Sequence, residues 1–442
     1  MDRLASNGEV DYKAGKGSGG RAVAAASIGN ALEWYDFSVY AFFAVYISEN
    51  FFVNSDSTVQ LLNAFLVFAL GFVVRPLGAL VMGVYGDKAG RKAALTLTIL
   101  TMAAGTLIIA VAPTYSAIGV AAPLLIVLGR ILQGFSAGGE FGSAAAFLVE
   151  HAPENKKGRY ASWLQASMAI SNILGALVGT LVTLLLTREQ VGDWGWRIPF
   201  IFGLLIAPVG LYLRKTLDET PHFQQEVERG RQEAEQKKTP LLQVIREHPR
   251  ELLIGTSLSI LWVVCVYSLI IFMPTYVQKT LHFDSSQAFL ASLIGNIFMV
   301  VGCVFSGTLS DIFGRRRVLA LSALFMLVGV YPLLGWVEAS HSTVTLVVVQ
   351  TVFCLMVAMF VGVAPSALSE IFPTRVRSTG MSLSYNIAVT IFGGFAPAIL
   401  TWLTQNTGNT FAPAWYVMAG AVITLVAVIF LPHHRRSLAT TA

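Results

Sequence analysis

Twelve long apolar runs constrain what this chain can fold into more than any other feature of its sequence. Each has about 20 residues, which is enough for an α-helix to cross a bilayer. An open sheet would leave backbone groups unpaired in lipid, and the runs lack the alternation of barrel strands. We therefore predict an all-α membrane protein whose twelve transmembrane helices lie near residues 22–47, 60–85, 93–112, 118–149, 159–187, 195–213, 251–278, 286–309, 318–337, 343–369, 380–403 and 412–431.

Charged residues are scarce and unevenly placed. They make up 12% of the chain, against about 25% in an ordinary soluble domain. Of the 30 Lys and Arg residues, 25 lie in the N-terminal segment, the loops after the even-numbered spans, or the C-terminal segment. Positively charged loops are retained on the cytoplasmic side, so both ends of the chain are expected in the cytoplasm. The net charge of +5 reflects this topology, and no nucleic acid is expected as a partner.

A short motif occurs once in each half of the chain. The sequence GDKAGRK, which contains Asp87 and Arg91, returns as SDIFGRR, which contains Asp311 and Arg315. The acid and the arginine are both displaced by 224 residues. The chain is therefore expected to consist of two similar halves.

A second repeat leads to the same conclusion. Glu150 and Glu370 each precede a proline by three residues, and both are followed by bases and a glycine. Two similar halves with six spans each predict two pseudo-symmetric six-helix bundles. The expected order is a disordered cytoplasmic N-terminus (1–21), an N-terminal bundle (22–213), a cytoplasmic linker (214–250), a C-terminal bundle (251–431) and a cytoplasmic tail (432–442).

Neither a targeting segment nor redox chemistry is indicated. Residues 1–21 carry Gly, Ser and mixed charges without an apolar core, so no secretory signal peptide is expected. Cys265, Cys303 and Cys354 all fall within apolar spans. We expect them to pack in the core rather than to form a disulfide or bind a metal. No cofactor is expected.

Several charged residues fall inside the apolar runs of the first half. A charge at the bilayer centre costs about 2.5–3.5 kcal/mol on insertion scales, so such residues usually face a cavity or a partner. Glu33 and Asp36 share one face of the first span, and Arg130 and Glu140 share one face of the fourth. These four are candidates for proton coupling, or for ion pairs that only hold helices together. Arg75, in the second span, either balances an acid of the first span or binds an anionic substrate.

Uncharged polar residues inside the spans complete the candidate site. Each of them could line a substrate cavity or make an interhelix hydrogen bond. The second half offers mainly groups of this kind, since intramembrane charge is nearly absent there. The candidates for substrate binding are Arg75, Tyr40, Gln133, Gln165, Asn172, Tyr385 and Asn386.

Two motifs of enzymes and pumps are excluded. GFSAG at 134–138 matches G-x-S-x-G, but that motif works in a strand-to-helix turn with aspartate and histidine partners. Here it lies in an apolar helix, and Gly134, Gly138 and Gly142 instead form a stripe that allows close helix approach. A phosphate-binding G-x-x-x-x-G-K-[ST] loop, which an ATP-driven pump requires, does not occur in the sequence. We predict that the chain is not an enzyme.

Over residues 22–432, the sequence resembles the major facilitator superfamily. The motifs GDKAGRK and RILQG, the latter beginning at Arg130, are similar to two of its common signatures. Together with GNALEWYDF, RPLG, WGWRIPF, YN and IFGG, they resemble its metabolite:proton symporter family. The resemblance implies proton-driven uptake of small metabolites into bacteria across the inner membrane. Such metabolites include di- and tricarboxylates, 2-oxoglutarate, shikimate, and osmolytes such as proline and betaine.

The resemblance also implies roles for individual residues. Arg130 would belong to a proton-coupling motif, and the repeated Asp and Arg residues would form cytoplasmic contacts that close the pore. The predicted gating residues are Asp87, Arg91, Glu150, Asp311, Arg315 and Glu370.

Our main hypothesis is proton symport of a small organic acid by alternating access, with the proton as the coupling ion. A proton symporter of a zwitterionic osmolyte, or a non-transporting membrane sensor with the same fold, are the alternatives. The expected partners are an anionic metabolite, protons and the lipid bilayer, and the chain is expected to be a monomer.

Overall fold

Each of the twelve predicted spans contains helix in the computed structural model. The structure describes residues 18–53, 56–89, 91–137, 144–145, 148–149, 152–205, 208, 240–373 and 376–431, and no strand occurs among them. Within these residues, eight helical stretches are long and apolar enough to cross a membrane, and three shorter apolar helices occupy further predicted spans. The prediction of an all-helical, multi-pass membrane protein is confirmed.

The first half begins earlier than predicted, because helix is already present at Ser18. Its elements are α1 (Ser18–Phe42), α2 (Ala44–Phe51), α3 (Ser57–Val73), α4 (Arg75–Ala89), α5 (Arg91–Val111), α6 (Tyr115–Ile118), α7 (Ala121–Ser136), η2 (Glu154–Lys156), α9 (Lys157–Ala161), α10 (Trp163–Leu185), α11 (Arg188–Asp193) and η3 (Gly195–Arg197).

The second half begins at the end of the predicted linker, whose residues 214–239 lie outside the described part of the chain. Its elements are α14 (Pro240–Glu247), α15 (Pro249–Val266), η4 (Tyr267–Ile271), α16 (Met273–Lys279), α17 (Ser285–Phe313), α18 (Arg315–Ser340), α19 (Thr343–Val361), α20 (Ala364–Ile371), α21 (Arg377–Ala388), η6 (Val389–Gly394), α22 (Ala396–Thr407) and α23 (Ala412–Ile429). The elements η4 and η6 are π-helical.

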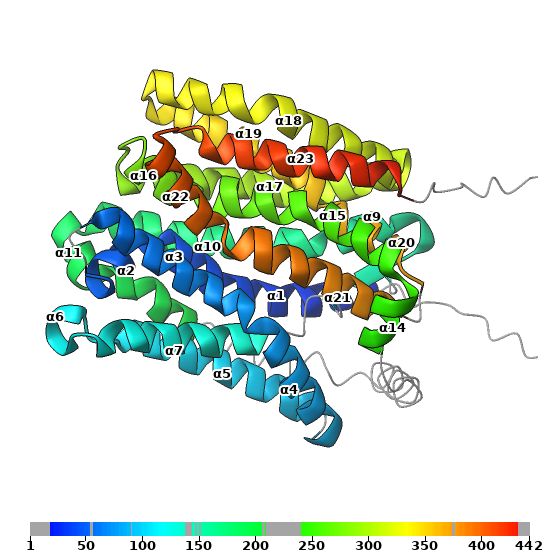
Figure 1. Ribbon diagram of the computed structural model, residues 1–442, viewed down its shortest axis with the longest axis horizontal. Coiled ribbons are helices and arrows are strands. Elements are labelled where there is room, and N and C mark those ends of the chain that lie inside the picture. The colour runs from blue at the N-terminus through cyan, green and yellow to red at the C-terminus, as the bar shows by residue number, and fades with distance from the viewer. Residues whose placement is uncertain are drawn as a thin grey trace, which may run out of the picture.

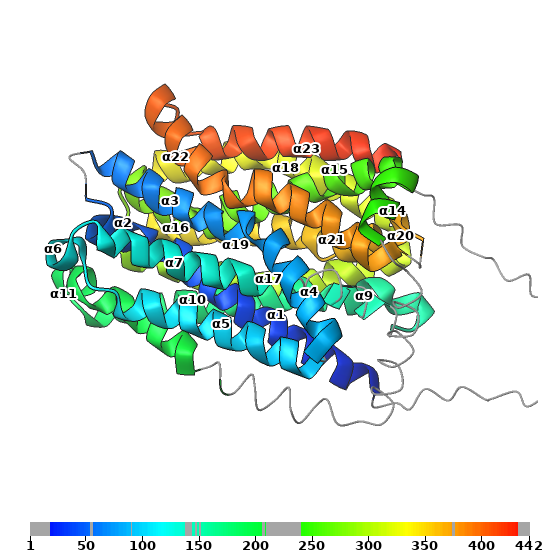
Figure 2. The ribbon, with the colours of Figure 1, turned by 60° about the horizontal axis from the view of Figure 1, so that its bottom comes forward.

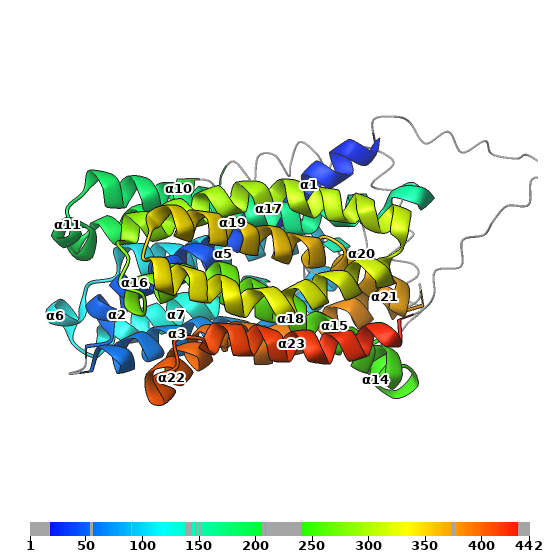
Figure 3. The same ribbon diagram turned by 90° about the horizontal axis from the view of Figure 1, so that it is seen from above.

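The helices run roughly along the long axis of the molecule, in two groups that meet at a seam (Figures 1 and 2). At the seam α10 packs along α17, and α3 packs against α22 and η6. We call the end with α9, α14 and α20 the basic end, because the Lys and Arg residues of the two repeated motifs lie there. The end with α2, α6 and α11 is called the opposite end (Figures 1 and 3).

Three helices are irregular at the same place in the seam. The second span breaks at Val74, between α3 and α4, where Pro76 in the next turn has no N–H to donate. In the other half, η4 and η6 interrupt the spans that contain Pro274 and Pro397. The break at Pro76 follows from the sequence, whereas the two π segments were not predicted. Such segments occur frequently at functional sites.

The irregular segments touch one another. A Cβ built on Gly393 would lie 3.0 Å from the Tyr267 ring, and one built on Gly394 would lie 2.8 Å from the Phe72 ring. Thr390 Oγ1 donates to the backbone carbonyl of Phe72 at 3.4 Å. The point where α3 breaks is therefore packed directly against both π segments of the other half.

Candidate functional site

Arg75 lies in the seam and is paired with Glu33 of α1. Its Nη2 atom is 3.2 Å from Glu33 Oε1, and the two side chains are 2% and 12% exposed. The guanidinium carbon lies 4.6 Å from the centre of the Phe37 ring and 4.5 Å from that of Phe72, with Trp34 at 5.8 Å. Nη2 is engaged in this ion pair, whereas Nε has no hydrogen-bond partner within the described residues. Arg75 thus balances an acid of the first span while its Nε–H group stays available to a ligand carboxylate.

Arg130 is fully buried and is held by aromatic faces. Its guanidinium carbon lies 4.5 Å from the ring centres of Phe37 and Tyr40, and 4.9 Å from that of Phe68. It donates to the backbone carbonyl of Phe68 at 3.2 Å and to Gln133 Oε1 at 2.9 Å. Cation–π contacts of this kind are strongest where water is excluded. The predicted site residue Tyr40 therefore contacts Arg130, and its hydroxyl donates to Ala64.

Asp36 is connected to Arg130 through two intervening side chains. Gln133 Nε2 donates to Thr106 Oγ1 at 2.9 Å, and Thr106 Oγ1 donates to Asp36 Oδ2 at 2.8 Å. No salt bridge joins Asp36 directly to Arg130 in the part of the chain that the structure describes. Thr106 was missed in the sequence, because a hydroxyl inside an apolar run is common in membrane helices and carries little signal.

Other predicted binding residues bridge the two halves. Trp262 Nε1 donates to Gln165 Oε1 at 3.2 Å, and Asn172 Nδ2 donates to Asn296 Oδ1 at 3.2 Å. The ring of Tyr385 packs against Trp262, with centres 5.0 Å apart. These residues lie together at the seam, and in this arrangement Gln165 and Asn172 make the interhelix hydrogen bonds that were the alternative to a binding role.

Asn386 and Tyr267 are two further residues of the second half that bear on the candidate site. Asn386, also a predicted binding residue, is half-buried and donates to Ser382 Oγ at 3.2 Å. Tyr267 was not predicted: its ring packs against Trp34 and Phe72, and its hydroxyl has no hydrogen-bond partner among the described residues. A buried hydroxyl without a partner is costly, so Tyr267 is available to a ligand.

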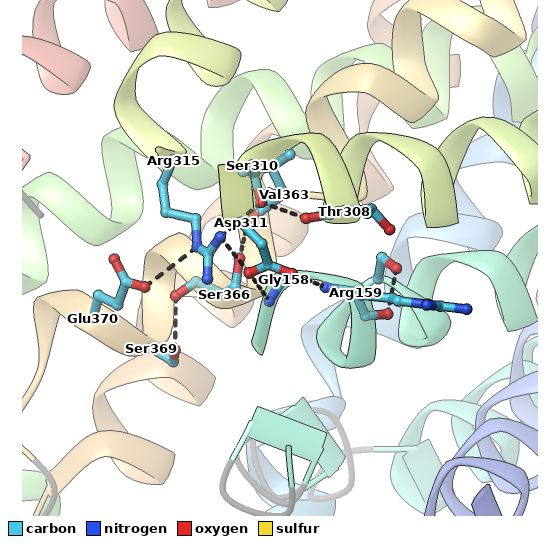
Figure 4. Close-up of polar contacts among 12 residues, drawn as sticks. Gly158, Arg159, Thr308, Ser310, Asp311, Arg315, Val363, Ser366, Ser369 and Glu370 are labelled. Atoms are coloured by element: carbon cyan, nitrogen blue, oxygen red, sulfur yellow. Dashed lines mark hydrogen bonds and ion pairs between the residues drawn. The ribbon is translucent and has the colours of Figure 1, made fainter. Parts of the chain in front are cut away.

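At the basic end, Asp311 connects the halves (Figure 4). Its carboxylate accepts from the backbone N–H groups of Gly158 at 2.8 Å and Arg159 at 3.0 Å, at the start of α9. The first N–H groups of a helix lack intrahelical partners and favour a negative charge. Arg315 Nη1 lies 2.7 Å from Asp311 Oδ1, and its Nε lies 3.3 Å from Glu370 Oε1. Three predicted gating residues are thus brought together on the N-terminus of a first-half helix.

Glycines allow this contact. Gly314, between α17 and α18, has φ of +88°, a conformation that favours glycine. A Cβ on Gly158 would lie 2.5 Å from the carbonyl oxygen of Gly307, and one on Gly307 would lie 2.6 Å from that of Gly158. The side chains of the other predicted residues, Asp87, Arg91, Glu140 and Glu150, lie outside the described residues, so their roles stay predictions.

The halves also meet at the opposite end. Lys279 Nζ lies 3.0 Å from Glu49 Oε1, and Tyr46 donates to Ser285 Oγ at 2.9 Å. The ring of Phe43 stacks on Phe289, with centres 5.1 Å apart. Contacts between the halves at both ends leave the charged residues of the seam buried between them.

Comparisons with known proteins agree with this architecture. Residues 26–312 match the Major Facilitator Superfamily, and residues 231–438 match the family described as Sugar (and other) transporter. The chain is 36% identical over 403 residues to the citrate-proton symporter of Salmonella typhi, covering 91% of this chain and 92% of that protein. It is 37% identical over 417 residues to the proline/betaine transporter of Salmonella typhimurium, covering 92% and 82%.

A solved structure is similar as well. The crystal structure of a D-xylose-proton symporter matches with a TM-score of 0.73 at 19% identity, covering 93% of this chain and 98% of that one. At this identity the match shows the fold. Because the family match spans most of the chain and the relatives exceed 30% identity over nearly all of it, the chain belongs to the major facilitator superfamily.

Proposed function

We propose that this protein takes up a small organic acid together with protons by alternating access, across a bacterial inner membrane with both termini in the cytoplasm. The observation that carries the proposal is two buried acid–base assemblies, Glu33 with Arg75 at the seam and Asp36 linked to Arg130 inside the first half. Charges at this depth are costly and usually serve substrate or proton movement. The citrate-proton symporter among the relatives supports the same reading.

In this proposal the two assemblies have different tasks. Arg75 binds a carboxylate of the substrate through its Nε–H group, which lacks a hydrogen-bond partner in the described structure, with Tyr267 on the other side of the Phe72 ring that Arg75 contacts. Protonation of Glu33 or Asp36 removes a negative charge that otherwise attracts an arginine. The contacts at the two ends open in turn, with Asp311 and Arg315 closing the basic end. Glu140, by its position on the span of Arg130, is a further acid of the proton path.

The central experiment is uptake by purified protein in proteoliposomes. Labelled citrate is offered with an acidic exterior and a negative interior potential. A potential of about 100 mV, negative inside, contributes about 2.3 kcal/mol per net positive charge moved inward with the substrate and its protons, or roughly fifty-fold in accumulation. We expect accumulation that collapses when a protonophore is added. Uptake that ignores both the pH gradient and the potential would contradict the proposed coupling.

A zwitterionic substrate is the second candidate. The Glu33–Arg75 pair presents one charge of each sign, and the aromatic rings of Trp34, Phe37 and Phe72 surround it. A zwitterion could bind with its carboxylate at Arg75 and its cationic nitrogen at Glu33 and an aromatic face. Labelled proline and betaine in the same liposomes distinguish the two candidates: accumulation of either without citrate uptake favours the osmolyte.

The contact at the basic end makes a separate prediction. Asp311→Asn removes the negative charge that accepts from Gly158 and Arg159 and that faces Arg315. A hydrogen bond to a charged group contributes about 1.5 kcal/mol or more, so backbone amides at 154–165 should exchange with solvent on the order of tenfold faster. Hydrogen-exchange mass spectrometry of purified protein measures this change.

Asp284→Asn is the matched control. Asp284 also caps a helix, α17, but does so with Gln287 of its own half at the opposite end. Its replacement should leave exchange at 154–165 unchanged. Equal exchange in Asp311→Asn and wild type would show that Asp311 does not hold the basic end closed.

A further inference from the structure

Thr106 hydrogen-bonds both to Asp36 and to Gln133, the residue that accepts a hydrogen bond from Arg130. We infer that its hydroxyl is the switch that couples protonation of Asp36 to the hydrogen bonding of Arg130, with Gln133 as the link. The inference rests on the proposed proton coupling and adds a positioning residue to it. It concerns the interior of α5, where the sequence indicated no functional residue beyond Arg91 at its first position.

Three hydrogen bonds connect Arg130 to Asp36 through Gln133 and Thr106, and the donor of each is fixed by chemistry. A guanidinium has donors only, so the atom of Gln133 that faces Arg130 at 2.9 Å must be the amide oxygen. The amide nitrogen of Gln133 must then donate to Thr106 Oγ1 at 2.9 Å. That donation uses a lone pair of the hydroxyl and leaves its single hydrogen for another acceptor.

Two acceptors compete for this hydrogen. Thr106 Oγ1 lies 2.8 Å from Asp36 Oδ2 and 3.1 Å from the backbone carbonyl of Met102. When Asp36 is ionised, its carboxylate is the stronger acceptor, and every bond in the chain points from Arg130 towards the negative charge. When Asp36 is protonated on Oδ2, the carboxyl becomes a donor, and the Thr106 hydrogen turns to Met102.

The two protonation states of Asp36 differ in the strength of the hydrogen bond between Arg130 and Gln133. Hydrogen bonds in series strengthen one another, and a charge at one end strengthens those nearest to it most. Protonation of Asp36 therefore weakens the hold of Gln133 on Arg130 without any contact between Asp36 and Arg130. Arg130 then depends on its aromatic neighbours and on the Phe68 carbonyl.

Other groups near Asp36 do not offer an equivalent connection. Arg130 and Tyr35 are the charged and titratable groups that act on it electrostatically, and the Tyr35 hydroxyl donates elsewhere, to the Pro199 carbonyl at 2.8 Å. The other carboxylate oxygen, Asp36 Oδ1, faces Gly203, which has no side chain that could form a hydrogen bond. In the part of the chain that the structure describes, Thr106 is the one hydrogen-bond donor to this carboxylate.

Around Arg130, the titratable and charged neighbours are Tyr40 and Tyr267, together with Arg75, which is paired with Glu33. Arg130 lies over the face of the Tyr40 ring, and its hydrogen bonds within the described residues go to Gln133 and the Phe68 carbonyl. The path through Gln133 and Thr106 is therefore the polar route between Asp36 and Arg130 within the described residues.

The test compares Thr106→Val, which keeps the shape and removes the hydroxyl, with Thr106→Ser, which keeps the hydroxyl. Proteoliposomes are loaded and assayed with whichever of citrate, proline or betaine the wild type accumulates. Accumulation driven by a pH gradient requires coupling, whereas counterflow of labelled against unlabelled substrate requires no net proton movement. Both are measured over a series of external pH values.

We expect Thr106→Val to lose accumulation by about tenfold or more, within the usual range of coupling between sites. Its counterflow should stay within about twofold of wild type, as for a change that leaves substrate binding intact. Its uptake should also depend less on pH than that of the wild type, and Thr106→Ser should restore both properties. In an Asp36→Asn background, Thr106→Val should cause no further loss of accumulation.

The inference is overturned if Thr106→Val accumulates substrate with the wild-type pH profile. It is also overturned if both Thr106 variants lose accumulation and counterflow in parallel, since that result assigns Thr106 to packing alone. Should Thr106→Val not fold, Thr106→Cys, which has only a weak donor, is judged by the same outcomes. A wild type that does not respond to a pH gradient would instead refute the proposed function, and the inference with it.

Discussion

Arg75→Gln is expected to abolish uptake and to destabilise the folded protein by about 3–5 kcal/mol, the usual result of removing one partner of a buried ion pair. The variant removes the Arg75 charge that faces Glu33 at 3.2 Å, in a position where the Glu33 side chain is only 12% exposed. It also removes the donor proposed to bind the substrate carboxylate. Thermal unfolding in detergent and uptake in proteoliposomes measure the two effects separately.

A double variant distinguishes folding from binding. Glu33→Gln with Arg75→Gln removes both charges together, so most of the lost stability should return, since a neutral pair of similar size avoids the cost of one unpaired charge. Uptake should not return, because the carboxylate-binding group is still absent. Uptake by the double variant at the wild-type rate would exclude Arg75 from substrate binding.

Lys279→Gln is the control for Arg75→Gln. It also removes the base of an ion pair, with Glu49 at 3.0 Å, but these side chains are 33% and 45% exposed. Exposed pairs contribute about 0–1 kcal/mol, so the melting temperature should change little. A loss as large as that of Arg75→Gln would mean that contact between the halves, rather than burial of charge, sets the stability.

The fold could be predicted because membrane helices follow from length and apolarity alone. The same physics identified Glu33, Asp36, Arg75 and Arg130, since a charge within an apolar run requires a partner wherever the helices come to lie. The pairing of Arg75 with an acid of the first span was one of two predicted alternatives, and Glu33 is that acid.

The neutral members of the site could not be found in this way. Thr106 and Tyr267 lie in apolar runs where hydroxyls are ordinary, and their importance arises only from which helix faces them. The rotation and register of a helix depend on its packing against segments that are distant in the sequence. The periodicity of one segment carries no information about that packing. The π segment η4, which begins at Tyr267, and the segment η6, which packs against it, are a further consequence of tertiary packing.

The basic end shows another limit of pattern reasoning. The repeat identified Asp311 and Arg315, but part of what Asp311 binds is backbone, the N–H groups of Gly158 and Arg159. A backbone donor leaves no side-chain signature in the sequence. Only the two glycines that let the helices approach, Gly158 and Gly307, hint at the contact.

Gly134→Ala is expected to cost about 3 kcal/mol of stability, at the upper end of the usual range for overpacking. A Cβ on Gly134 would overlap the carbonyl of Gly71 in α3. The obstructing atoms are backbone, so no change of side-chain rotamer relieves the collision, and α7 must move away from α3. Because Arg130 and Gln133 lie on α7, the shift should also separate Gln133 from Thr106 and reduce proton-driven uptake.

Gly175→Ala in α10 is the matched control for this prediction. Its Cβ would meet Val39 at 3.5 Å, an ordinary contact. Alanine is favoured over glycine in a helix by up to about 1 kcal/mol, so this variant should melt at or above the wild-type temperature. Melting of both variants is followed in detergent by the fraction that remains monodisperse after heating. If Gly134→Ala melts at the same temperature as Gly175→Ala, α7 does not depend on close backbone contact with α3. The position of Arg130 must then be fixed by its aromatic neighbours instead.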